Sequence, residues 1–178
     1  GGCCRGGCSG ADEAEVVLRE YAATWKYDSI WANSAYSDQV NALKDEFPDI
    51  LWVVAGSGNE PIGDNAYWVF LHIHEAAYLM GRYAGALTDT DVIGMIAGFE
   101  TDDTLDTFNG FLDGARSVNP DVTAKVSYIE SWYDPAKGAE AARAQIAAGA
   151  DQIYTQSYGF EACAEADIYC YTTYTDQN

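Results

Sequence analysis

The sequence predicts an α/β protein built on mainly parallel sheets. Residues 50–56 (ILWVVAG) and 91–99 (DVIGMIAGF) are unbroken apolar runs of strand length, typical of parallel strands that are covered on both faces. Longer segments with helical periodicity alternate with such runs. One of these segments, 104–117, has an apolar stripe made of Leu105, Phe108, Phe111, Leu112 and Ala115. We therefore expect three-layer sheets with helices on both faces.

The first half of the chain alternates between helix and strand. We expect strands over 28–34, 50–56 and 66–72, and helices over 12–24, 37–46 and 75–87. The apolar face of the first helix would carry Val17, Leu18, Tyr21 and Trp25. Ser37 or Asp38 could cap the second helix, and Pro48 would end it. Residues 56–65 (GSGNEPIGDN) predict a loop because they are rich in Gly, Pro and Asn.

The second half repeats this alternation. We expect strands over 91–99, 122–131, 151–157 and 167–174, and helices over 104–117, 135–148 and 160–166. The sequence marks both ends of the middle helix. Asp134 stands at the N-cap position with Pro135 in the first turn, and Gly149 follows the last turn.

A polar break divides the chain into two halves. It lies near Thr88–Asp91, so we expect a first, N-terminal lobe over 11–90 and a second lobe over 91–178, both partial. Residues 1–10 (GGCCRGGCSG) match no helix or strand pattern, and we interpret them as a disordered leader or as sequence that is not native. The chain has no run of about 18 apolar residues, so no transmembrane helix is expected.

The charge of the chain excludes two classes of partner. It has 28 acidic and 9 basic residues and a formal net charge of −19. A protein that binds nucleic acid or an anionic membrane needs a basic surface, which nine scattered cations do not supply. The acidic residues are spread along the chain. Such a surface fits a protein adapted to high salt, although ordinary acidic proteins share this composition.

Cysteine and histidine residues do not predict a metal site. Cys3, Cys4 and Cys8 have no trusted zinc spacing, and the odd total of five cysteines excludes a complete disulfide framework within one chain. We interpret Cys170 as a small buried residue of a strand. His72, His74 and Glu75 could bind a metal ion from one face of a strand. The simpler interpretation, which we favour, is that they lie at a junction between strand and helix.

Motifs of catalysis are absent from the sequence. It has no GxSxG, GxxxxGK[ST] or helix-opening GxGxxG pattern, so we expect neither an enzyme nor a cofactor. Aromatic residues instead gather at strand ends, where ligands of open α/β sheets bind and where rings can stack on a planar ligand. They are Tyr36, Trp68, Trp132, Tyr133, Tyr158 and Tyr174. Each of them taken alone could equally be a core residue.

Several segments together resemble one family. They are FPDILWVVAGS, DNAYWVFLHIHEAAYLMGRYAGAL, DVIGMIAGFE, and the series GARSVNPD, SWYDPAKG and GADQIYTQ in this order. They are similar to the basic membrane protein family of substrate-binding proteins of ABC importers, also called PnrA-like. The resemblance implies two lobes of the type I periplasmic-binding-protein fold. It also implies a protein outside the cytoplasm, at the cell surface or in the periplasm and usually lipid-anchored. Such a protein passes a purine nucleoside or similar ligand to a membrane permease without any chemistry.

The resemblance also implies a set of ligand-binding residues. It consists of Tyr36, Asn65, Tyr67, Trp132, Gln156, Tyr174 and Asp176. Tyr174 stands where the family has its ribose-binding Asp, and Asp176 and Gln177 keep the family pattern. Glu75 and Gly81 match helix positions that serve packing and the hinge.

Two other classes of function remain as alternatives. The same two-lobed fold could serve a ligand-sensing signalling or regulatory protein. An enzyme would need a nucleophile beside a base or a cofactor loop, and we find neither in the sequence. Partial lobes would leave sheet edges and apolar faces uncovered, so we also expect a tendency to aggregate or dimerise.

Overall fold

A computed structural model describes residues 11–56, 61–156 and 158–172. The chain divides into two compact units between Leu71 and His72, and each unit has its own core. Both contain only parallel strand pairs in their named sheets, so the predicted α/β class is confirmed. Among the described residues, no helix is long and apolar enough to cross a membrane.

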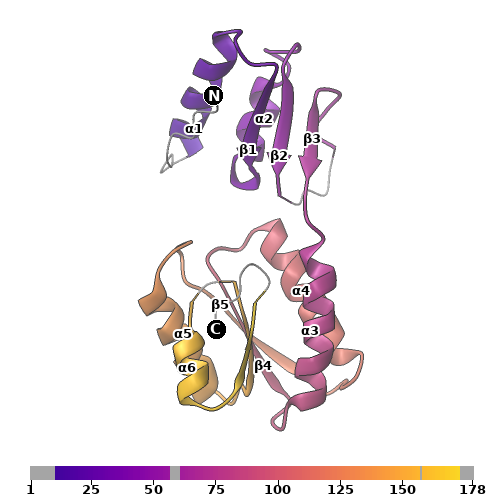
Figure 1. Ribbon diagram of the computed structural model, residues 1–178, viewed down its shortest axis with the longest axis vertical. Coiled ribbons are helices and arrows are strands. Elements are labelled where there is room, and N and C mark those ends of the chain that lie inside the picture. The colour runs from indigo at the N-terminus through magenta and orange to yellow at the C-terminus, as the bar shows by residue number, and fades with distance from the viewer. Residues whose placement is uncertain (1–10, 57–60, 157, 173–178) are drawn as a thin grey trace. The chain divides into compact units, whose positions relative to one another are not determined.

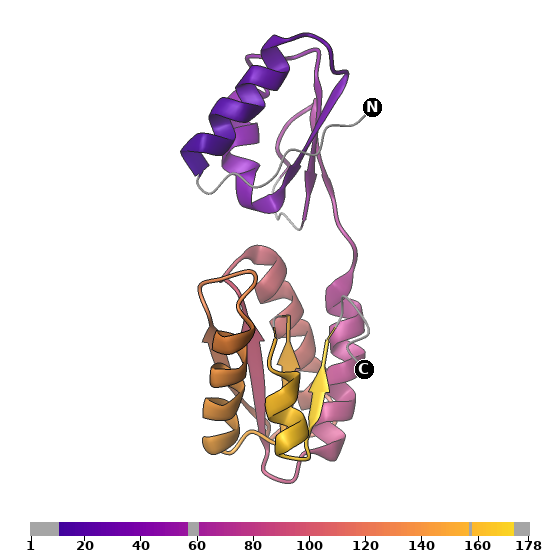
Figure 2. The same ribbon diagram turned by 60° about the vertical axis from the view of Figure 1, so that its left-hand side comes forward.

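The first unit is a three-stranded sheet with helices on one face. Its elements are α1 (Ala11–Ala23), β1 (Ser29–Asn33), the 3₁₀ helix η1 (Ser34–Tyr36), α2 (Ser37–Leu43), β2 (Leu51–Ala55) and β3 (Ala66–Val69). The strand order is β1-β2-β3. Figure 2 shows α1 and α2 on the same side of this sheet. Their apolar faces bury Ile30, Trp52 and Val54, which point to that side.

In the described part of the first unit, helices cover one face of the sheet, as the prediction of a partial lobe allows. On the face opposite the helices, Trp31 aligns with Val53 and Tyr67 across the three strands. Trp31 is 64% exposed and Tyr67 is 53% exposed, whereas Val53 between them is buried. The continuous apolar run of β2 therefore reflects burial by neighbouring side chains on one face and by helices on the other.

The second unit has the predicted three layers. Its elements are α3 (Ile73–Leu87), β4 (Val92–Ala97), α4 (Asp102–Arg116), β5 (Thr123–Tyr128), α5 (Pro135–Ala147), β6 (Gln152–Thr155), α6 (Phe160–Glu165) and β7 (Tyr169–Tyr171). The strand order is β5-β4-β6-β7. Figure 1 shows the sheet between the pair α3 and α4 and the pair α5 and α6. One core cluster lies on each side of the sheet.

Helices α3 and α4 pack with their backbones unusually close together. A Cβ atom on Gly81 would lie 1.9 Å from the carbonyl oxygen of Phe111, and one on Gly114 would lie 2.0 Å from that of Tyr78. Only glycine allows this approach. It places α3 in the second unit, so the division at Leu71 and His72 lies before the predicted polar break at Thr88–Asp91.

The helix ends test the capping predictions. Asp134 caps α5 by accepting a hydrogen bond from the backbone N–H of Lys137 at 3.0 Å, and Gly149 follows with a φ of 98°, so both predictions are confirmed. The predicted cap of α2 is wrong, because η1 precedes this helix and Asn33 caps η1. The placement of Trp25 on the apolar face of the first helix is also wrong, since α1 ends at Ala23 and Trp25 is 64% exposed.

A disulfide joins Cys163 of α6 to Cys170 of β7. The interpretation of Cys170 as just a small buried residue of a strand is therefore wrong, since it is half-buried and bonded to Cys163. The two Cα atoms are 6.0 Å apart, within the range that a disulfide spans. Strand β7 follows α6 directly and returns along it, and periodicity alone does not show this proximity.

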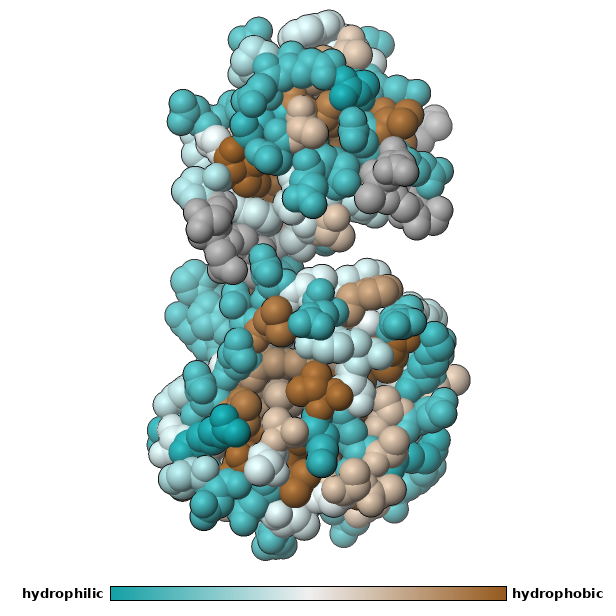
Figure 3. Space-filling view, turned by 180° about the vertical axis from the view of Figure 1, so that it is seen from behind, coloured by the Kyte–Doolittle hydropathy of each residue, from teal (hydrophilic) through white to brown (hydrophobic). Residues whose placement is uncertain are grey.

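The molecular surface combines hydrophilic and apolar areas. On the face that Figure 3 shows, hydrophobic residues drawn in brown form patches within a largely teal, hydrophilic surface. Large hydrophobic side chains are exposed in both units, among them Trp31, Leu71, Leu79, Tyr83 and Tyr133.

Candidate functional site

The carboxyl ends of β4, β5 and β6 meet at one edge of the second sheet. Because the three strands are parallel, the segments that follow them leave the sheet at the same edge. These segments carry Phe99 after β4, Trp132 after β5 and Gln156 after β6. The structure thus brings two of the predicted ligand residues, Trp132 and Gln156, to one edge.

A hydrogen-bonded polar group lies at this edge. Thr101 caps α4, and its hydroxyl lies 3.1 Å from that of Thr104. Thr104 is buried and donates to Oε1 of Gln156 at 3.1 Å. The backbone N–H of Gln156 donates to the carbonyl of Ile96 at 2.9 Å. The side chain of Gln156 is therefore anchored through its oxygen, which orients its NH₂ group as a hydrogen-bond donor.

Two aromatic pairs accompany this polar group. The rings of Phe99 and Trp132 lie 4.9 Å apart, and those of Tyr133 and Tyr158 lie 5.0 Å apart in an edge-to-face arrangement. Trp132 remains 58% exposed. A Cβ atom on Gly98 would lie 2.8 Å from Cε3 of Trp132, so glycine at this position allows the indole ring to lie against the end of β4.

Tyrosine hydroxyls near this edge remain protonated at neutral pH. Burial raises the pKa of Tyr158, and the neighbouring Tyr133 raises it further. Burial also raises the pKa of Tyr128, with a smaller contribution from the negative charge of Glu100. These groups therefore offer neutral hydroxyls to a ligand and no phenolate charge.

The arrangement is suited to binding a ring-shaped ligand. Aromatic faces can stack on such a ligand, and the amide of Gln156 can donate a hydrogen bond to it. Covalent or acid–base catalysis by cysteine or histidine would need one of these side chains at this edge. Among the described residues that follow β4, β5 and β6 at this edge there is neither histidine nor cysteine.

The first unit places one predicted ligand residue at the corresponding edge of its own sheet. Tyr36 is the last residue of η1, and η1 directly follows β1. The side chain of Asn33 accepts a hydrogen bond from the N–H of Ala35 at 3.1 Å and turns the chain there. Tyr36 is half-buried against the core of this unit.

Asn65 lies just before β3, at the opposite, amino-terminal edge of that sheet, and Tyr67 lies within β3 on the exposed face. The side-chain nitrogen of Asn65 donates to the carbonyls of Lys44 at 3.0 Å and Ile50 at 3.2 Å. The hydroxyl of Tyr67 donates to the carbonyl of Asp64 at 2.7 Å. The structure thus does not bring these two residues together with Tyr36, and it gives Asn65 the task of holding the turn before β2.

Two predicted residues lie outside the described part of the chain, and three residues near the carboxyl edge of the second sheet were not predicted. Tyr174 and Asp176 lie outside the described residues and stay predictions. Thr101, Thr104 and Phe99 were not predicted. Thr101 stands before two acidic residues and an apolar helical stripe, which is an N-cap pattern that could have drawn attention to this turn.

Comparisons with known proteins identify the family of the chain. The family model described as "ABC transporter substrate-binding protein PnrA-like" matches residues 7–166. The chain is 32% identical over 142 residues to a putative ABC transporter glucose-binding protein of Haloferax volcanii, covering 79% of this chain and 36% of that protein. It is 31% identical over 144 residues to a purine-binding protein of Brucella abortus, covering 81% and 40%.

Solved structures support the fold. An ABC transporter solute-binding protein of Aeropyrum pernix superposes with a TM-score of 0.76 at 19% identity, covering 93% of this chain and 50% of that one. A sugar transporter of Clostridium phytofermentans superposes with a TM-score of 0.71 at 19% identity, covering 93% and 65%. The chain thus spans about two fifths of the two sequence relatives and one half to two thirds of these structures. The family match covers most of the chain, which belongs to the PnrA-like family of ABC transporter substrate-binding proteins.

Proposed function

We propose that the chain is part of the solute-binding component of an ABC importer and that its ligand is a purine nucleoside or a similar small molecule. The observation that carries this proposal is the carboxyl edge of the second sheet, where Trp132 follows β5 and the anchored amide of Gln156 follows β6, on either side of β4. The names of relatives add support for a small-molecule ligand. One relative is called purine-binding and one nucleoside-binding, and a third is called glucose-binding.

The proposed binding mode uses stacking and hydrogen bonds without chemistry. Trp132 would stack on the base, a contact worth about 1–3 kcal/mol for a base on an aromatic ring. Gln156 would donate to a ring nitrogen or carbonyl oxygen, and its bond to Thr104 limits the rotational freedom that binding would remove. Tyr36, Tyr174 and Asp176 remain predicted ligand residues. We assign Asn65 and Tyr67 to the support of the first sheet.

The proposal extends to where the protein works. As the solute-binding component of an importer, it would act outside the cytoplasm, held by a lipid anchor at the membrane, and deliver its ligand to a permease. Fractionation of cells that carry the full-length protein would test this location.

We also propose that the surface is adapted to high salt. The net charge of −19 repels itself at low ionic strength and is screened at high ionic strength. A melting temperature that fails to rise from low to molar potassium chloride would contradict this proposal.

Calorimetric titration of the full-length protein tests the proposed ligand. Nucleosides, purine bases and glucose are compared, and we expect a nucleoside to bind most tightly. Trp132→Ala should weaken that binding by about tenfold to a hundredfold, the loss of one stacking contact. Trp31→Ala is a matched control, because Trp31 is similarly exposed but lies in the middle of a strand.

Two results would contradict the proposal. One is a full-length protein that binds none of the compounds, and the other is a Trp132→Ala variant that binds as well as the Trp31→Ala variant. Preference for glucose would replace the nucleoside with a sugar and leave the site in place. The described residues carry no feature that separates a sensor from a carrier, so signalling gains no support over transport.

A further inference from the structure

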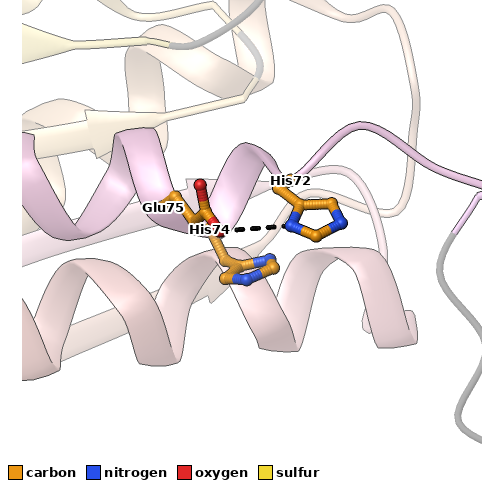
Figure 4. A group of neighbouring side chains, drawn as sticks. All are labelled: His72, His74 and Glu75. Atoms are coloured by element: carbon orange, nitrogen blue, oxygen red, sulfur yellow. Dashed lines mark hydrogen bonds and ion pairs between the residues drawn. The ribbon is translucent and has the colours of Figure 1, made fainter.

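A cluster of three metal-binding side chains lies at the start of α3, away from the edge described above. His72, His74 and Glu75 each offer one donor atom, and these three atoms lie within 4.8 Å of one another. Nδ1 of His72 is 3.1 Å from Oε1 of Glu75, and the two imidazole rings are stacked with their centres 5.5 Å apart. Figure 4 shows the three side chains next to one another at the first turn of the helix.

The junction between β3 and α3 explains why the donors meet. His72 is the N-cap residue, and its backbone is not helical, with φ −73° and ψ 59°. Its side chain makes no capping bond to the backbone and reaches Glu75 three residues on. The sequence-based interpretation placed both histidines at such a junction, and the structure has this junction. It brings the two rings together on the same turn.

Helix α4 holds the other side of this turn. A Cβ atom on Gly110 would lie 2.6 Å from the carbonyl oxygen of His74, so the two helices touch here. The groove between them is lined by His74, Glu75 and, from α4, Asp106, Asn109 and Asp113. The two aspartates add negative potential to that of Glu75. This potential opposes the partial positive charge of the helix N-terminus, which otherwise disfavours a cation.

One ring nitrogen lacks a protein partner. Within the described part of the chain, Nδ1 of His74 is buried and has no hydrogen-bond partner. A buried polar atom without a partner costs free energy. A ligand bound to the ring, or the tautomer that this ligand selects, would change this cost.

We propose that His72, His74 and Glu75 form a binding site for a divalent transition-metal ion, with zinc as the expected ion. Two imidazoles and one carboxylate are a common zinc ligand set, with ligand distances of about 2.0–2.2 Å. Magnesium and calcium prefer sites made of oxygen atoms alone. His72 and Glu75 are exposed, so rotation of their side chains can bring the donor atoms to the shorter separation that a shared ion requires.

Bound zinc would connect the residue before α3 to the first turn of this helix. It would leave coordination positions open to water, since three protein ligands do not complete a tetrahedral site. This site shares no residue with the group formed by Thr104, Trp132 and Gln156, so the two sites can be tested separately.

Zinc titration of the full chain tests the proposal. Cys3, Cys4 and Cys8 are replaced with serine in all samples, because thiolates bind zinc as well. We expect one ion to bind and His72→Ala, His74→Ala and Glu75→Gln each to weaken binding at least about tenfold, because each removes a direct ligand. Glu140→Gln is the control, since Glu140 is an exposed carboxylate on another helix, and it should leave the affinity unchanged.

Nuclear magnetic resonance gives a readout that does not depend on affinity. The chain has only two histidines, so every imidazole signal comes from this cluster. Zinc should shift the ring signals of both histidines, and magnesium should leave them in place. The proposal is overturned if the imidazole signals do not move, or if replacing both histidines leaves zinc binding unchanged. Either result would assign the bound ion to acidic residues elsewhere, whatever the outcome of the nucleoside titration.

Discussion

The two units use the same β-α connection but cover their sheets differently. In the second unit, helices lie on both faces, and β4 is buried from Ile93 to Ala97. In the described part of the first unit, α1 and α2 lie on one face, and the other face exposes Trp31 and Tyr67. An apolar strand run thus indicates burial of the strand, and it does not indicate what buries it.

The exposed face of the first sheet is a surface of the kind from which we expect self-association. Exposed apolar patches on a sheet favour contacts between molecules. Self-association itself stays a prediction, which light scattering can check. A clean monomer would contradict it.

The largest expected effect tests the one-sided core of the first unit. Trp52 is fully buried on the helix side, so Trp52→Ala should lower the free energy of unfolding by about 3–5 kcal/mol. Trp31→Ala removes the same side chain from the opposite face of the neighbouring strand and should cost less than about 1 kcal/mol. Denaturant unfolding measures both values. Equal losses would mean that the second face is also covered in solution.

A smaller effect tests the boundary between the units. Gly81→Ala places a methyl group against the carbonyl of Phe111 and should destabilise the second unit by about 2 kcal/mol. Ala86→Leu, at an exposed position of the same helix, is the control and should change stability by less than about 0.5 kcal/mol.

Hydrogen exchange shows which unit the Gly81 substitution affects. Amides of α3 and α4 should exchange faster together, whereas those of β1 and β2 should keep their protection. If α3 instead exchanged with the first unit, the predicted boundary near Thr88–Asp91 would describe the molecule better than the division at Leu71 and His72.

Local patterns predicted most of the fold. The ends of α5 followed from Asp134, Pro135 and Gly149, because a cap and a left-handed glycine act on neighbouring residues. The strands β2 and β4 followed from apolar runs of the right length. Each of these features depends on only a few consecutive residues.

Contacts between residues that are far apart in the sequence could not be predicted from such local patterns. The bond from Thr104 to Gln156 joins residues 52 positions apart, and the pairing of Cys163 with Cys170 depends on the path of β7 along α6. Asn65 shows a different limit of local motifs. Its place in a family-like motif suggested a ligand residue, but its amide group is engaged by the backbone at the amino-terminal edge of the sheet.

The smallest effect concerns the covered face of the second sheet at high pH. Tyr171 of β7 lies half-buried beside Phe111 and donates to Oε1 of Gln152 at 2.7 Å. Burial raises its pKa to about 12, with smaller contributions from Tyr169 and Asp151. The unfolded chain loses this proton near pH 10 and the folded chain keeps it until about pH 12. The free energy of unfolding should therefore be unaffected by this group below about pH 10 and fall between about pH 10 and 12.

The loss should be about 1 kcal/mol, less than the full shift implies, because the side chain is partly exposed to solvent. Denaturant unfolding of the protein and of Tyr171→Phe across this pH range isolates the contribution of one tyrosine among thirteen. Tyr67→Phe is the control, since Tyr67 lies on the exposed face of the first sheet. If Tyr171→Phe keeps the full alkaline loss while Tyr67→Phe reduces it, the face of the second sheet is open to solvent, and the contrast between the two units does not hold there.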